Sequence, residues 1–177
     1  MPHVLILFVL SLSLPFLAVA EQNAKENRLD LIELRGIQVM PFSLDQTTHV
    51  FTKTVNGGIQ KVVVKNDRNM EQIRLIREHL SKTAKEFSQH DFSDPERIHG
   101  KDMPGLAELR VAEVGELAVT YSELSNGGRI DYTSEKPELI EAIHRWFDAQ
   151  LSDHERHAIS GHEHHHMQGG HLEPERQ

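Results

Sequence analysis

The 177-residue chain contains no cysteine. This absence excludes disulfides, zinc–thiolate sites and thiol nucleophiles, and it leaves imidazole, carboxylate and thioether groups as the available metal ligands. The chain also lacks an HExxH pair, a Walker loop, a GxSxG turn and an EF-hand loop, so none of these motifs assigns a chemistry. The net charge is −8 without a basic stripe, which argues against binding to nucleic acid or to an anionic membrane surface.

The first residues carry no Lys or Arg, which is atypical for an export signal, but a continuous apolar run follows over residues 4–20. The run ends in Ala18-Val19-Ala20, a small-x-small cleavage pattern, and the chain then turns abruptly polar. This pattern predicts a signal peptide over residues 1–20 and a secreted or periplasmic protein. The alternative is an uncleaved membrane anchor, for which the apolar run is short.

Cleavage after Ala20 leaves 157 residues, which suits one domain with its own core. Residues 21–46 are expected to form an N-terminal extension whose charged first part, residues 21–31, is frayed. The domain itself is expected over residues 47–159. Residues 160–177 have no apolar period, so we expect a disordered histidine-rich tail.

Two segments of the domain, residues 47–88 and 117–152, share one plan. Asn56-Gly57-Gly58 and Asn126-Gly127-Gly128 stand at corresponding places between strand-forming residues. Asn-Gly suits the two positive-φ positions of a type I′ turn, so each segment begins with a predicted β-hairpin. A helix follows each hairpin. The pattern favours a duplicated ββα unit over two unrelated hairpin–helix units that share a common turn.

Apolar residues recur with helical spacing after each hairpin and form one stripe per helix. The stripes are Ile73, Ile76, Leu80, Ala84 and Phe87 in the first helix, and Ile140, Ile143, Phe147 and Leu151, with Trp146 beside them, in the second. We therefore expect Trp146 to be buried. Both stripes are satisfied by a two-layer α+β sandwich, in which a four-stranded antiparallel sheet carries two helices on one face.

Residues 89–116 connect the two units and have no counterpart in either. The segment is too apolar for a disordered linker, and we expect it to pack across the sheet or the helix ends. Its central part reads His99-Gly-Lys-Asp-Met103-Pro-Gly. A histidine and a methionine are metal-ligand types, so the segment is a candidate part of a site.

Seven of the thirteen histidines lie in the last 24 residues. Neutral imidazole binds copper, zinc and nickel, and thioether suits reduced copper. The tail is therefore the first candidate metal site. Its predicted ligands are His154, His157, His162, His164, His165, His166, Met167 and His171. The alternatives are a solubilising polar tail and a purification remnant, and the sequence is not a standard hexahistidine run.

A second, internal candidate site combines residues from the two helices and the connecting segment. Its members are His79, His99, Met103 and His144, with Asp148 as a carboxylate that could orient His144. The alternative is a purely structural role, in which each histidine forms hydrogen bonds to the backbone and binds no ligand. No catalytic residue is assigned, although a hydrolase that uses a serine with His79 or His144 stays open.

Three stretches carry a family resemblance. They are FSLDQTTHVFTKTVNGG (residues 42–58), HGKDMPGL (99–106) and AIHRWFDAQLSDH (142–154). They resemble a family of small exported bacterial proteins without an established role, sometimes labelled aspartate carbamoyltransferase, and the resemblance covers residues 40–157. The label would imply a transferase. Carbamoyltransferases, however, are longer and cytoplasmic and carry an S-T-R-T loop and an H-P-x-Q segment, which are absent here.

The sequence thus predicts an exported protein that buffers or delivers copper or zinc, with nickel as a further candidate. Its partners would be metal ions. The alternative is a non-enzymatic module that binds another exported protein, with histidines that are incidental or sense pH. An enzyme is the third interpretation. No nucleic-acid or membrane partner is expected after signal cleavage.

Overall fold

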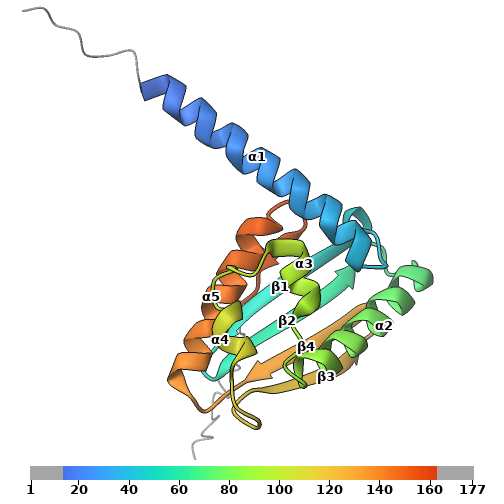
Figure 1. Ribbon diagram of the computed structural model, residues 1–177. Coiled ribbons are helices and arrows are strands. Elements are labelled where there is room, and N and C mark those ends of the chain that lie inside the picture. The colour runs from blue at the N-terminus through green and yellow to red at the C-terminus, as the bar shows by residue number, and fades with distance from the viewer. Residues whose placement is uncertain (1–13, 163–177) are drawn as a thin grey trace, which may run out of the picture.

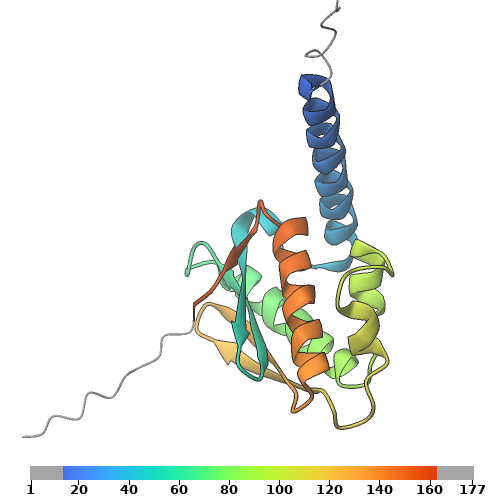
Figure 2. The ribbon, with the colours of Figure 1, turned by 90° about the vertical axis from the view of Figure 1, so that its left-hand side faces the viewer.

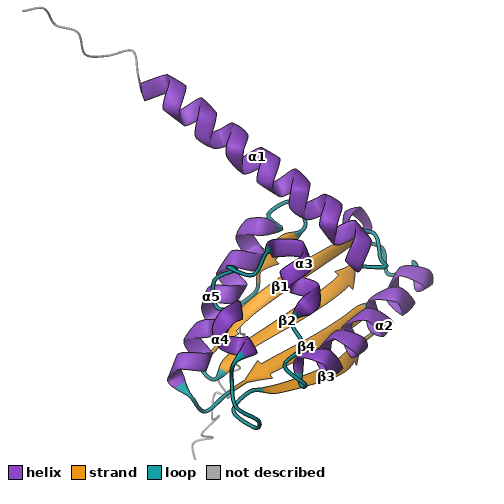
Figure 3. Ribbon diagram, in the orientation of Figure 1, coloured by secondary structure: helices purple, strands orange, loops and turns teal. Residues whose placement is uncertain are grey.

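The computed structural model describes residues 14–162, which form a five-stranded sheet with helices on one face (Figures 1 and 3). The strand order is β3-β4-β2-β1-β5. Figure 2 shows the sheet on one side of the body and the helices on the other. The strands are β1 Thr47–Thr54, β2 Gly57–Val64, β3 Ala118–Leu124, β4 Gly127–Thr133 and β5 Ala158–Ser160.

Both predicted hairpins are present. β1 pairs with β2 and β3 with β4, each antiparallel. The two turns consist of Val55-Asn56 and Ser125-Asn126, and Gly57 and Gly127 already belong to the following strands. Neither asparagine has a positive φ, so the predicted type I′ turns with Asn and Gly as their central residues are wrong. β2 and β4 join the hairpins into one sheet. The ββα order therefore occurs twice along the chain, whereas the duplication that could explain it stays a prediction.

The sheet is mixed and five-stranded, which corrects the expected four-stranded antiparallel sheet. β5 runs parallel to β1 at the edge of the first hairpin. The amide of His49 donates to the carbonyl of His157 over 2.8 Å, and the amide of Gly161 donates to the carbonyl of Phe51 over 2.9 Å. An edge strand offers unpaired backbone groups, and these bonds satisfy them. Three residues are too short to show a strand pattern in the sequence.

Two long helices cover the inner face of the sheet. α2 (Met70–Phe87) packs against β4 and β3, and α5 (Pro137–Asp153) packs against β2 and β1. Each helix thus lies mainly over the hairpin of the other unit. Trp146 is 1% exposed, which confirms its predicted burial. Its ring makes an edge-to-face contact with the ring of Tyr132 on β4, and the two ring centroids are 5.3 Å apart.

The connecting segment contains two short helices, α3 (Ser93–His99) and α4 (Leu106–Arg110), where the sequence predicted little regular structure. α4 packs on α5. Gly105 makes this approach possible, because a Cβ there would lie 2.1 Å from the carbonyl oxygen of Ala142. Its φ of +80° also favours glycine. The segment lies in front of the sheet between α2 and α5 (Figure 1).

The first described element, α1 (Leu14–Val39), is a helix that extends away from the body (Figures 1 and 2). Residues 21–31, expected to fray, belong to it. Its last turns pack on the domain, where Leu29 and Ile32 are buried. The predicted cleavage position after Ala20 lies within this helix and stays a prediction. None of the helices in residues 14–162 combines the length and the apolar character needed to cross a membrane.

Ion pairs hold α1 against the C-terminal end of α5 and the residues that follow it. They join Lys25 to Glu155, Arg28 to Asp153, and Arg156 to both Asp30 and Glu33. Along α1, two cations are followed by two anions, and each faces a group of opposite charge. Burial of two apolar side chains together with these pairs accounts for the helical order of a segment whose composition is strongly polar.

Candidate functional site

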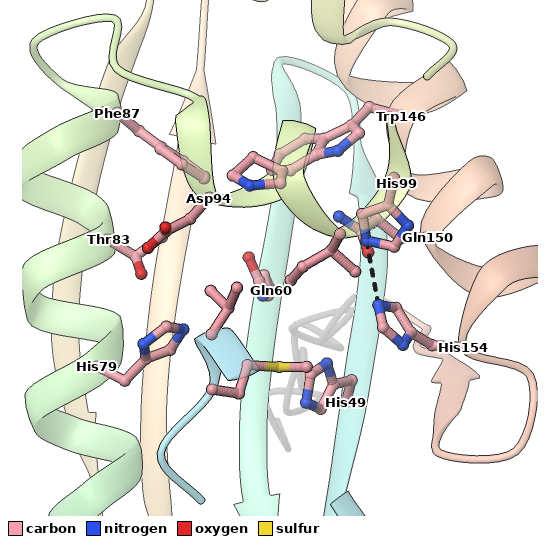
Figure 4. Close-up of a pocket in the computed structure, with 14 residues that line it drawn as sticks. His49, Gln60, His79, Thr83, Phe87, Asp94, His99, Trp146, Gln150 and His154 are labelled. Atoms are coloured by element: carbon pink, nitrogen blue, oxygen red, sulfur yellow. Dashed lines mark hydrogen bonds between the residues drawn. The ribbon is translucent and has the colours of Figure 1, made fainter. Parts of the chain in front are cut away.

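A cavity of about 60 Å³ lies between α2 and α5. Its floor is formed by β1 and β2, and α3 and the end of α1 cover it. Four histidines line it, namely His49, His79, His99 and His154 (Figure 4). They come from β1, α2, α3 and the residue directly after α5, so the cavity gathers imidazoles from four separate parts of the fold.

His99 and His154 form the most ordered part of this wall. The two Nε2 atoms face each other at 3.2 Å, the contact drawn dashed in Figure 4. The other ring nitrogen of His99, Nδ1, lies 2.8 Å from an oxygen of Asp153. Arg28 of α1 holds the same carboxylate with two hydrogen bonds of 3.0 and 2.8 Å. An Arg–Asp–His–His chain therefore runs from α1 into the cavity.

Local sequence explains how these side chains are placed. Trp146, Gln150, Asp153 and His154 have the spacing of one helical face, and all four are buried. His99 is the last residue of α3, and Gly100 ends that helix at a φ of +95°. The end of α3 at Gly100 thus places His99 beside His154, at the C-terminal end of α5.

Hydrogen bonds and burial set the protonation states of the side chains in this Arg–Asp–His–His series. Burial alone raises the pKa of Asp153, but hydrogen bonds from His99 and Arg28 outweigh it, and the net pKa lies below the ordinary value. Asp153 is therefore ionised and accepts the proton on His99 Nδ1. With the proton on Nδ1, the other nitrogen of a neutral imidazole carries a lone pair, and in His99 this nitrogen is Nε2. Burial and the neighbouring histidines lower the pKa of His154 well below its usual value, so its ring is also neutral.

His49 was not expected from the sequence as a site residue. It is 4% exposed, and its Nε2 has no hydrogen-bond partner. Its ring centroid lies 5.6 Å from that of His154. Burial, followed by repulsion from His79, His157 and His99, lowers its pKa to about 3. The signal in the sequence was its place two residues before Phe51 on β1, because alternate strand residues share a face.

The predicted tail ligands separate into three groups. His154 and His157 belong to the folded domain: His154 follows α5 directly, and both ring nitrogens of His157 are buried without a hydrogen bond. His162 is described and exposed. The remaining predicted ligands, His164, His165, His166, Met167 and His171, lie outside the described residues.

The predicted internal set is only partly brought together. His79 and His99 line the same cavity. His144 lies elsewhere, and its Nε2 is 3.0 and 2.9 Å from the carbonyl oxygens of Thr54 and Gly57. This residue therefore has the structural role that the sequence left open as the alternative. Asp148, expected to orient His144, pairs instead with Lys53. Met103 is buried in the hydrophobic core and does not line the cavity.

Within residues 14–162, no three histidine, aspartate or glutamate side chains are arranged to hold one metal ion. The described part of the site therefore offers a pair of imidazoles, with a carboxylate behind one of them. The sequence did not single out Asp153 or Gln150. Their spacing from Trp146 was the available signal, because residues four and seven positions after a buried residue share its helix face.

No family model, curated protein or solved structure matches the chain.

Proposed function

We propose that the protein is an exported metal-binding protein that buffers or delivers copper or zinc. In the folded domain, Nε2 of His99 and Nε2 of His154 are the ligands. The histidines of residues 162–171 form a second, weaker set that captures ions from solution. Nickel would fit the same imidazole ligands.

The observation that carries the proposal is the 3.2 Å separation of the two Nε2 atoms. Zinc binds imidazole nitrogen at about 2.0–2.1 Å in tetrahedral sites, which places two such nitrogens about 3.3 Å apart. The pair thus has the spacing of two ligands of one ion. Binding would replace the N–H···N contact, and the proton on Nε2 of His154 would move to Nδ1, so that both rings stay neutral.

Asp153 gives further support. A metal-bound histidine commonly donates its second ring N–H to a carboxylate, which fixes the ring and its tautomer. His99 makes this bond to Asp153 at 2.8 Å. Arg28 holds the carboxylate in turn, so the ligand is oriented before an ion arrives.

Two protein ligands leave coordination positions open. Structural zinc sites have four protein ligands, so a two-histidine site suits an ion that is exchanged rather than one that is held permanently. This property favours buffering or delivery over a structural role.

Metal analysis of the full-length chain, purified without a nickel column, tests the proposal. A matched variant, the Gln-tail protein, carries glutamine at His162, His164, His165, His166 and His171. After dialysis against limiting zinc or copper, we expect the Gln-tail protein to keep one ion per chain while the unchanged protein keeps more. A Gln-tail protein without bound ion would refute the site in the domain.

A second candidate function is a partner-binding module whose histidines sense pH. It is favoured by the position of the buried histidines at the attachment point of α1, where Asp153 links His99 to Arg28. Protonation of His154, whose pKa is lowered by burial, would place an unfavourable charge beside His99. It would thereby weaken the attachment of α1 and change the surface that a partner meets. Hydrogen exchange of α1 at pH 7 and pH 5 in metal-free protein tests it, and equal protection would refute it.

A further inference from the structure

The cavity contains buried polar atoms that no protein group satisfies. They are Nε2 of His49, Oγ1 of Thr83 and Nε1 of Trp146, which come from β1, α2 and α5. A buried donor without a partner costs about 1–3 kcal/mol. A polar molecule bound in the cavity would satisfy these atoms.

The indole of Trp146 determines which hydrogen-bonding group the bound molecule must carry. An indole N–H donates and never accepts, so its partner must present an acceptor atom. Trp146 lies over the cavity in the view of Figure 4, on the same side as His99 and Gln150. The molecule thus brings an acceptor close to the proposed metal ligands.

The charge of the site restricts it further. Two neutral imidazoles leave the charge of a divalent ion uncompensated in a buried place, which is costly. Asp153, which lies behind His99, is already bonded to Arg28 and His99. Asp94, which lines the cavity, pairs with Lys82 and Arg97. An anionic molecule from outside is therefore favoured.

We propose that the cavity binds a small carboxylate. One of its oxygens completes the coordination of the ion held by His99 and His154, and the other accepts the hydrogen bond that Nε1 of Trp146 lacks. This inference rests on the proposed metal site. Carboxylate oxygen is an established zinc ligand.

The size of the cavity sets the class of carboxylate. A volume of 60 Å³ holds about five water-sized spheres, at about 10–15 Å³ each. Acetate and other monocarboxylates with a few heavy atoms fit this space.

Because the chain has a single tryptophan, its indole N–H gives one NMR cross-peak. We would titrate zinc-loaded Gln-tail protein with acetate and, as a neutral isostere, with acetamide. We expect a saturable downfield shift of the indole N–H with acetate and none with acetamide. Trp146→Phe, checked for folding by its thermal midpoint, lacks the indole signal, so its acetate and zinc affinities are compared with those of the parent by calorimetry. Acetate binding should weaken about tenfold, as for one hydrogen bond to a charged acceptor, and zinc affinity should stay within about twofold.

Two further results separate the two proposals. The His99→Ala variant of the Gln-tail protein should lose the acetate response because it loses the ion. If zinc binds but acetate leaves the indole signal unmoved, water alone fills the cavity and the carboxylate proposal is overturned. If zinc does not bind at all, the metal site fails, and the carboxylate proposal fails with it.

Discussion

His49 makes the protein sensitive to acid. Its pKa is about 3 in the folded chain, because the ring is buried and three other histidines repel its charge. The unfolded chain has the ordinary value of about 6.5. Between these values the unfolded state binds more protons than the folded state. The contribution of His49 to the free energy of unfolding is therefore fully present above pH 6.5 and is lost as the pH falls toward 3.

The size of the effect follows from that difference. One pKa unit corresponds to about 1.4 kcal/mol, so His49 alone should lower the free energy of unfolding by about 2 kcal/mol between pH 7 and pH 5. Burial of His154 and His79 lowers their pKa values too and adds to the loss. Most carboxylates stay ionised in this window, and the window therefore reports on histidines.

Urea denaturation of metal-free Gln-tail protein, followed by the fluorescence of Trp146, measures the loss at pH 7, 6 and 5. His49→Gln is the matched variant, because an amide does not titrate. We expect its stability to fall by about 2 kcal/mol less than that of the parent between pH 7 and pH 5. Parallel pH profiles for the two proteins would show that His49 is not held neutral by burial.

Three further substitutions test the fold by urea denaturation. Trp146→Ala removes a buried aromatic ring and should cost about 3–5 kcal/mol; a loss under 1 kcal/mol would refute its packing. Gly105→Ala places a Cβ 2.1 Å from the carbonyl of Ala142 and should cost about 1–3 kcal/mol or more; an unchanged midpoint would contradict the close approach of α4 to α5. Arg28→Met removes two hydrogen bonds to Asp153 and should cost about 1–3 kcal/mol; unchanged hydrogen exchange in α1 would contradict the attachment.

Short-range signals located the hairpins, the two long helices and the burial of Trp146. Asn56-Gly57 and Asn126-Gly127 located each turn to within one residue but not its type, and the apolar stripes need only helical spacing. The order of the strands and the addition of β5 depend on contacts between distant residues. Residues 158–160 form a strand only because the edge of β1 is available, and the local sequence does not record this.

The candidate site shows the same division. His99 and His79 were singled out by residue type, and both line the cavity. His154 lies within the predicted domain but was grouped with the tail ligands because histidines cluster in the last 24 residues. In the structure it belongs to the buried chain of Arg28, Asp153 and His99. A polar network is satisfied through partners far apart in sequence, so hydrophobic periodicity does not detect it.

The most direct test of the metal site is a calorimetric zinc titration of the Gln-tail protein at pH 7.5, beside two variants of it. His99→Ala removes one proposed ligand, and His144→Ala removes a histidine that bonds to backbone carbonyls elsewhere. We predict one ion per chain in the parent, a loss of affinity of at least about 100-fold in His99→Ala, and a change below about threefold in His144→Ala. Equal effects of the two substitutions, or no zinc binding by the parent, would contradict the account.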